Sequence, residues 1–159
     1  MIMNDFPKRK PNRLKSHNYC DGTYFITICT ENKKCLLSQI VGADTIRPNT
    51  VKLTMYGKIV ENAIHNIPAI YPNCCVDKYV IMPNHIHLIL SVNHSDGRIL
   101  SAPTVIGQFK RYVTKKVGFS IWQKGFYDHI IRDDEDYITK AQYIENNPAK
   151  WQEDKYYIT

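Results

Sequence analysis

The sequence predicts a small α+β domain in which strands and helices alternate in the order βαββαβα. Three observations favour this fold class. Short runs rich in β-branched and aromatic residues alternate between apolar and polar positions, which is typical of strands. Longer segments between them carry apolar residues at helical spacing. The chain of 159 residues, 43% hydrophobic and 23% charged, is long enough to bury one core of its own.

The first half of the chain is expected to hold a basic arm, one strand and one helix. Residues 1–20 are polar and basic and are interpreted as an N-terminal arm. Residues 23–30 (TYFITICT) predict a strand because they are β-branched and aromatic. Apolar residues at helical spacing predict a helix over residues 51–67, capped by Asn49-Thr50 and ended by Pro68.

The second half predicts a hairpin followed by a helix, a strand and a final helix. Residues 75–82 and 85–92 are interpreted as strands joined by a tight turn at Pro83-Asn84. A sheet of short antiparallel strands with helices on one face is the ferredoxin-like (RRM-like) sandwich. The remaining elements are a helix over 103–117 that ends at Gly118, a strand over 126–132, and a helix from Asp133 to about Asn147, stopped by Pro148.

Two histidines stand two positions apart in the segment MPNHIHLIL. Residues at i and i+2 of a strand point to the same face, so both imidazoles would project side by side. The aliphatic row that begins at Ile86 would pack on the helices, which places His85 and His87 on the open face of the sheet. Two imidazoles can share a metal ion if a third ligand arrives from elsewhere. A surface strand can also carry two histidines without a function, so the spacing alone leaves metal binding open.

The last helix offers a partner for the histidine pair. Tyr143 and Asn147 stand four residues apart, so they share one face of the helix. A tyrosine hydroxyl beside an amide oxygen suits a metal-assisted tyrosine nucleophile, although a boundary tyrosine and a helix C-cap would give the same pattern. The expected core stripe of this helix lies on a different face and consists of Tyr137, Ile138, Ala141 and Ile144.

Three stretches, VIMPNHIHLIL, IWQKGFYDHIIRDDEDY and YIENNPAKW, together resemble the HUH single-tyrosine transposases. They are most similar to the REP-associated tyrosine transposase branch of insertion-sequence transposases. The resemblance covers Thr23 to Trp151, with the three blocks in the family's order. It implies a catalytic domain over residues 21–151, preceded by the arm over 1–20 and followed by a C-terminal tail over 152–159.

The same resemblance implies a site and a reaction. His85, His87 and Asn147 would bind Mg²⁺ or Mn²⁺, and Tyr143 would attack the phosphorus of single-stranded or hairpin DNA. The attack would release a 3′-OH and leave a 5′-phosphotyrosine, which a second 3′-OH could reverse, so that DNA transposition proceeds without ATP. Tyr127 on the last strand competes for the role of nucleophile, as does Tyr112, which the helical spacing places nearer the core.

The net charge of +6 suits a polyanionic partner such as DNA. No apolar run approaches the ~20 residues of a membrane helix, the N-terminus lacks a signal peptide, and the five cysteines form no C-x-x-C pair. We therefore expect a cytoplasmic, nucleoid-associated protein without membrane contact, and a homodimer with exchanged tyrosine helices is one possible assembly. The candidate DNA-binding residues are Lys110, Arg111, Lys115 and Lys116 on one helix and Arg9 and Arg13 in the arm, although a solvated helix face and a disordered tail would explain the same charges.

Two other readings of the sequence remain open. A ferredoxin-like sheet with exposed aromatic residues also describes non-catalytic modules that bind single-stranded nucleic acid, and in such a module Tyr143→Phe would change no activity. A domesticated nickase that cuts only a chromosomal repeat is a variant of the transposase reading. A two-histidine phosphoesterase is disfavoured because it needs two H-x-[ST] motifs, which the chain lacks.

Overall fold

The protein folds around a four-stranded antiparallel sheet, seen in a computed structural model that describes residues 21–42, 50–93 and 100–158. Arg9 and Arg13 lie outside the described residues. The strands stand in the order β4-β5-β1-β6, which is the ferredoxin-like arrangement, so the predicted α+β sandwich is confirmed. Their bounds are Gly22–Cys29 for β1, Cys74–Ile81 for β4, His85–Val92 for β5 and Tyr127–Ile131 for β6.

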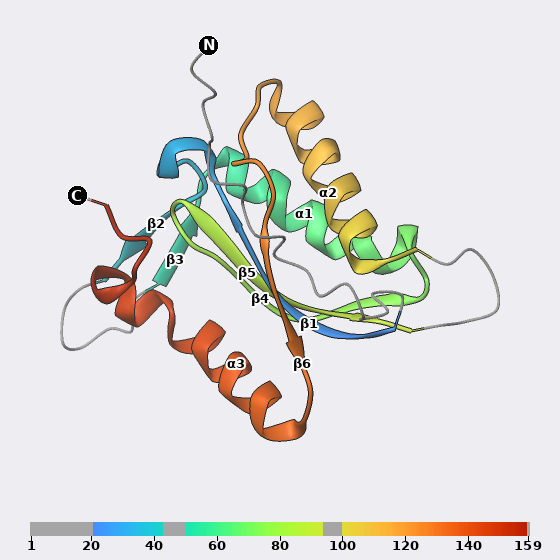
Figure 1. The fold of residues 1–159 in the computed structure, drawn as a ribbon. Coiled ribbons are helices and arrows are strands. Elements are labelled where there is room, and N and C mark those ends of the chain that lie inside the picture. Colours follow the sequence, from blue (N-terminus) through green and yellow to red (C-terminus); the bar gives the residue numbers. More distant parts are fainter. Residues whose placement is uncertain (1–20, 43–49, 94–99, 159) are drawn as a thin grey trace, which may run out of the picture.

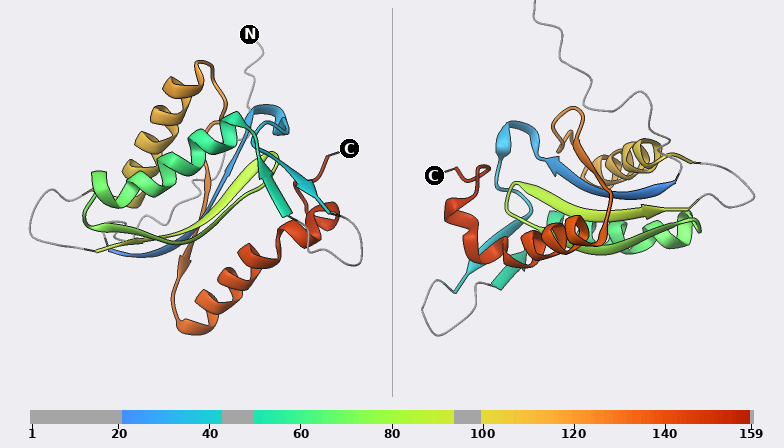
Figure 2. Two further views of the ribbon diagram at one scale, coloured as in Figure 1. Left: turned by 180° about the vertical axis from the view of Figure 1, so that it is seen from behind. Right: turned by 60° about the horizontal axis from the view of Figure 1, so that its bottom comes forward.

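Two helices cover one face of the sheet, and a third crosses the other face (Figure 1). Helix α1 (Met55–Ile70) and helix α2 (Ala102–Val117) pack against each other on the first face, as the view from behind also shows (Figure 2). Helix α3 (Asp134–Asn146) contacts β4 and β5 from the opposite face. Helix α3 therefore forms a second, smaller layer on the face that the sequence predicted to be free of helices.

Each helix begins at a side-chain cap that the sequence supplies. The hydroxyl of Ser101 accepts a hydrogen bond from the Thr104 N–H (3.3 Å) at the start of α2, and Gly118 ends that helix with φ +93°. The Asp133 carboxylate accepts from the Asp136 N–H (2.8 Å) at the start of α3. The predicted ends of these two helices hold to within a residue because their caps are local signals.

The start of α1 was predicted wrongly. Thr50 lies in strand β3 (Thr50–Leu53), which pairs with β2 (Ser38–Val41) in a second sheet of two strands. The cap of α1 is Thr54, whose hydroxyl accepts from the Gly57 N–H (3.1 Å). The local apolar spacing could not reveal a strand whose partner lies elsewhere in the chain.

The predicted stop of α1 at Pro68 is also wrong. Proline removes one backbone donor, yet the helix continues to Ile70, and the Tyr71 N–H still donates to the Ile67 carbonyl (2.8 Å). Both Ile67 and Tyr71 are buried in the main core, and this packing holds the last turn in place.

Alternation along β1 and β5 divides the interior into two layers. Even-numbered residues of both strands, such as Ile26 and Leu88, lie in the main core under α1 and α2. Odd-numbered residues face α3, where Phe25 and Ile89 join a smaller apolar cluster. Ala141 and Ile144 of the expected α3 stripe are buried there, and Tyr137 packs against the cluster; Ile138 is 54% exposed, which corrects its assignment to the stripe.

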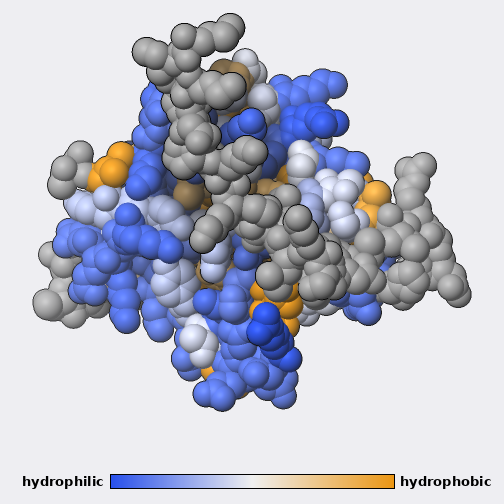
Figure 3. Space-filling view, in the orientation of Figure 1, coloured by the Kyte–Doolittle hydropathy of each residue, from blue (hydrophilic) through white to orange (hydrophobic). Residues whose placement is uncertain are grey.

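The surface seen in the orientation of Figure 1 is mostly hydrophilic, with small separate apolar patches (Figure 3). Among the described residues, no helix has the length and apolar character that crossing a membrane requires. After α3 the chain forms a short 3₁₀ helix, η2 (Pro148–Glu153), and then runs back toward the start of β5. This return places C-terminal residues next to the histidine pair.

Candidate metal centre and tyrosine site

The two histidines lie at the start of β5, opposite Cys29 and Thr27 of β1. Their rings point to the α3 side of the sheet, and their centroids are 4.6 Å apart. Both residues are buried, whereas the sequence predicted an open face. The difference arises because α3 and the C-terminal segment cover this face: the rings of Trp151 and Tyr156 lie 6.0 and 4.5 Å from the ring of His85.

Asn84 fixes the orientation of His85. Its side-chain nitrogen donates to the carbonyl oxygens of Tyr156 (2.8 Å) and Lys33 (3.3 Å), so its side-chain oxygen is left to accept. That oxygen lies 2.8 Å from Nδ1 of His85, which must therefore carry the proton. The Nε2 atom of His85 then presents a free lone pair, the form in which imidazole binds a metal.

His87 is held by its neighbours on β1. Its Nδ1 atom lies 2.7 Å from the hydroxyl of Thr27, and its ring stacks on Phe25 with centroids 5.1 Å apart. Burial lowers the pKa of His85 to about 4, against the opposing effects of Asp154 and Asn147. Burial, and then the neighbouring His85, also lowers the pKa of His87 well below its usual value. Both imidazoles are therefore neutral at pH 7.

Helix α3 brings a tyrosine and an amide to the same place. The Tyr143 ring lies 5.2 Å from the His87 ring, and Tyr143 keeps 40% of its surface exposed. Burial raises the pKa of the Tyr143 hydroxyl and the charge of Asp154 adds to the rise, whereas a side-chain contact with Asn147 lowers it. The structure thus gathers Tyr143, Asn147 and both histidines, all within one chain.

Four buried polar atoms at this site have no hydrogen-bond partner among the residues that the structure describes. They are Nε2 of His85, Nε2 of His87, Oδ1 of Asn147 and Oδ2 of Asp154. The ligand atoms of the two histidines and Asp154 all lie within 4.8 Å of one another. Ligands of one divalent ion at about 2.0–2.2 Å are at most about 4.4 Å apart, so a small movement would suffice. Nitrogen and oxygen atoms without donors are the surroundings that a divalent cation fits.

Three contributors to the site escaped the sequence analysis. Thr27 and Asn84 orient the histidines, but in the sequence they look like an ordinary strand residue and an ordinary turn residue. Asp154 lies in the segment interpreted as a tail. Its only signal is a carboxylate between Trp151, the last residue of the YIENNPAKW block, and Tyr156.

Of the basic residues predicted to bind DNA, the four that the structure describes lie on α2, which covers the other face of the sheet from α3 and its Tyr143 (Figure 1). The ammonium group of Lys110 donates to the carbonyl oxygens of Gln123 (2.8 Å) and Gly125 (2.6 Å), which gives this residue a structural role. The other three members of the predicted cluster, Arg111, Lys115 and Lys116, follow along the same helix.

A second group of cations surrounds the histidine site. The Lys140 ammonium lies 5.1 Å from the centre of the Phe25 ring, and the ammonium groups of Lys155 and Lys33 lie 5.0 and 6.0 Å from the centre of the Tyr156 ring. These three lysines come from α3, the C-terminal segment and the 3₁₀ turn η1 (Glu31–Lys33). We call them the rim lysines.

The competing tyrosines lie on other elements than Tyr143, and Tyr127 pairs in the sheet with Thr27. Tyr112 belongs to α2 and is 41% exposed, so its expected place near the core is wrong. Lys116 lies over its ring at 5.7 Å. Tyr127, at the start of β6, is 49% exposed.

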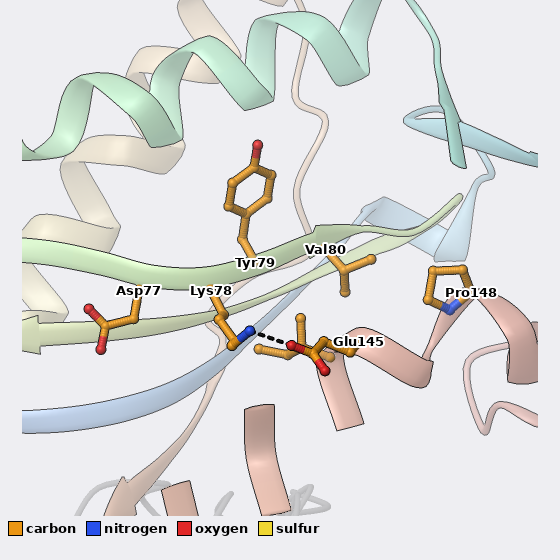
Figure 4. A pocket seen from close by; sticks show the side chains of 7 residues that line it. Asp77, Lys78, Tyr79, Val80, Glu145 and Pro148 are labelled. Carbon is orange, nitrogen blue, oxygen red and sulfur yellow. Dashed lines mark hydrogen bonds and ion pairs between the residues drawn. The ribbon is translucent and has the colours of Figure 1, made fainter. Parts of the chain in front are cut away.

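A separate hollow of about 300 Å³ lies between β4 and the end of α3. Lys78 and Glu145 point toward each other across it and form an ion pair (Figure 4). Tyr79 and Pro148 also line it, and none of its lining residues belongs to the histidine cluster. The ion pair ties α3 to the edge strand, which supports the placement of Tyr143.

Comparison with known proteins shows what this chain is similar to. No family model matches the chain. An uncharacterized protein of Haemophilus influenzae is 33% identical over 94% of this chain and 93% of its own length. A REP-associated tyrosine transposase of Escherichia coli is 28% identical over 81% of this chain and 67% of its own length. Over most of its length the chain is therefore similar to the family of REP-associated tyrosine transposases.

A solved structure of a member of this family, bound to a REP hairpin, shares the fold. It superposes with a TM-score of 0.65 and 24% identity, over 87% of this chain and 74% of that chain. The fold implied by the resemblance of the three sequence blocks is therefore confirmed.

Proposed function

We propose that the protein is a metal-dependent nickase and strand-transferase for single-stranded DNA that acts through Tyr143. The observation that carries this proposal is the position of Tyr143, a partly exposed tyrosine beside a buried cluster of unsatisfied nitrogen and oxygen atoms. Similarity to a transposase family supports an enzymatic role on DNA in general, and the geometry supports giving that role to these side chains.

The protein's own residues would orient and activate the nucleophile. Tyr143 projects its ring beside His87, and Asn147 contacts the hydroxyl and lowers its pKa, which opposes the effect of burial. Mg²⁺ or Mn²⁺ held by His85, His87 and Asn147 would neutralise charge on the scissile phosphate and polarise its phosphorus–oxygen bonds.

The reaction conserves one phosphodiester bond. The Tyr143 oxygen forms a bond to phosphorus and loses its proton, while the bond to the 3′ oxygen breaks and that oxygen leaves as a 3′-OH. The product is a 5′-phosphotyrosine. A 3′-OH from a second strand can attack the same phosphorus and release Tyr143, which joins two strands without an external energy source.

Hairpin DNA is the proposed substrate, and the solved relative bound to a REP hairpin supports this choice. The rim lysines and the cluster Arg111, Lys115 and Lys116 would contact phosphates on the two faces of the molecule. One chain contributes all of Tyr143, His85, His87 and Asn147, so a monomer would hold a complete site and an exchanged dimer is not required. A place beside chromosomal DNA in the cytoplasm follows from this function.

The test is a covalent-adduct assay. Labelled hairpin DNA with a single-stranded flank is incubated with the protein and Mg²⁺ or Mn²⁺, and adducts that survive denaturant are counted. We expect Tyr143→Phe to form at least about 1,000-fold less adduct than the wild type, because no other side chain replaces the nucleophile. Tyr112→Phe, on the far face of the sheet, is the matched control and should react like the wild type. Full adduct formation by Tyr143→Phe would overturn the nucleophile assignment.

Two variants of the function give different results in the same assay. A non-catalytic binding module would retain hairpin DNA without any adduct, and Tyr143→Phe would bind equally well. A domesticated nickase would form the Tyr143 adduct on one chromosomal repeat and on no other hairpin.

A further inference from the structure

We propose that Asp154 is a further protein ligand of the divalent cation, so that a C-terminal carboxylate completes the centre formed by His85, His87 and Asn147. This inference rests on the proposed function, since it concerns the same cation. It adds a residue outside the three sequence blocks that carry the family resemblance. It also gives the C-terminal segment a chemical role in place of that of a tail.

The first argument is the position of the carboxylate. The side chain of Asp154 is 2% exposed, and its Oδ2 atom lies 3.7 Å from Nε2 of His85. This separation is too long for a hydrogen bond, but it falls within the spacing of two ligands on one ion. The three ligand atoms of Asp154 and the two histidines form one compact group.

The second argument is the absence of a donor. Oδ1 of Asp154 accepts the Tyr156 N–H (2.8 Å), whereas Oδ2 is buried and has no partner within the described ranges of the chain. Because Asn84 places the His85 proton on Nδ1, the facing Nε2 atom offers a lone pair and no proton. Two acceptors that face each other in a buried site need a positive charge between them.

The third argument is how firmly the segment is placed. Asn84 donates to the Tyr156 carbonyl, and the Trp151 and Tyr156 rings both pack near His85. Residues on either side of Asp154 are therefore anchored to the turn that carries the histidines. A carboxylate fixed in this way adds a hard oxygen ligand and a negative charge, which favours Mg²⁺ or Mn²⁺.

The experiment measures Mn²⁺ binding to the full chain by calorimetry, without DNA. We expect Asp154→Asn, which keeps the shape of the side chain but removes its charge, to raise the dissociation constant for Mn²⁺ at least tenfold. Glu153→Gln, the exposed neighbour, removes the same charge one residue away and should bind like the wild type. Wild-type affinity in a folded Asp154→Asn protein would overturn the proposal.

A second variant tests ligation directly and guards against a folding defect. Asp154→Cys should give a thiolate-to-metal charge-transfer band when Co²⁺ is added, because the thiolate would bond to the ion. Glu153→Cys serves as the control and should give no new band over the wild type. Binding of Co²⁺ by Asp154→Cys without that band would also overturn the proposal.

The outcome separates this inference from the proposed function. If the wild type binds Mn²⁺ and forms the Tyr143 adduct while the Asp154 variants bind metal normally, only the Asp154 assignment fails. If the wild type binds no Mn²⁺ at all, the metal-dependent function fails with it.

Discussion

The two faces of the central sheet are built from the same two strands but differ in what they bury. Under α1 and α2, Ile26 and Leu88 lie in a continuous apolar core with no exposed surface. On the α3 side, Thr27 and His87 are equally buried, but polar atoms there lack partners. Alternation along one strand thus places residues that stabilise the core on one face and residues of the proposed site on the other. Whether a residue's number is even or odd predicts whether its substitution will change stability or chemistry.

The largest effect is expected for His87→Ala on the α3 face. Loss of a ligand should lower adduct formation at least about 1,000-fold, equivalent to about 4 kcal/mol of transition-state stabilisation. It should also abolish the stabilisation by Mn²⁺, which for the wild type is about 2.7 kcal/mol at a concentration 100 times the dissociation constant. Thermal unfolding with and without Mn²⁺ measures this second effect.

The control for His87→Ala is His65→Ala. His65 is an exposed histidine on α1, where it hydrogen-bonds the Tyr79 hydroxyl (2.9 Å). Its removal should leave both the adduct and the Mn²⁺ effect unchanged. Equal losses in the two variants would mean that the chemistry does not belong to the α3 face.

The next effect belongs to the other face. Leu88→Ala should lower the free energy of unfolding by about 2–5 kcal/mol, because it opens a cavity beneath α1 and α2. Chemical denaturation measures this loss. Metal affinity of the folded protein should stay at the wild-type value, although Leu88 directly follows His87. A large change in Mn²⁺ affinity would contradict the division between the two faces.

Local patterns in the sequence predicted the strand that carries the site. The predicted bounds of β5 at His85 and Val92 are confirmed, and the division between the histidines and the aliphatic row from Ile86 follows from the period of two of a strand. The cap of α3 at Asp133 was also readable, because capping depends on residues three positions apart. These features need only neighbouring residues.

The features that the sequence did not predict depend on contacts between distant parts of the chain. Residues of β3 were interpreted as helix because the strand they pair with, β2, was not recognisable from its own residues. Periodicity shows which residues share a face but not what covers that face, so the burial of the histidines under α3 was not foreseen. Asp154 reaches His85 only because the chain turns back through η2.

A smaller effect is expected when the support of His87 is removed. Thr27→Val keeps the shape of the side chain but removes the hydroxyl that lies 2.7 Å from Nδ1 of His87. Loss of such a partner typically costs about 10- to 100-fold in metal affinity, and calorimetry with Mn²⁺ measures it. Thr23→Val, on the same strand and the same face, is the matched control because its hydroxyl pairs with Ser91, away from the site. The two variants should be similarly stable and differ in metal affinity alone.

The smallest effects concern the two basic surfaces and the path of DNA between them. Replacing Lys140 and Lys155 of the rim with alanine should reduce the slope of log affinity against log salt by about 0.7 for each phosphate of a single strand that these lysines neutralise. This change should be seen with a short single strand, which spans only the α3 face.

The paired substitution of Lys115 and Lys116 on α2 should alter binding of a longer hairpin but not of the short strand, since α2 lies across the sheet. Equal effects of the α2 pair on both DNAs would place the single strand on the α2 face and separate binding from the tyrosine site.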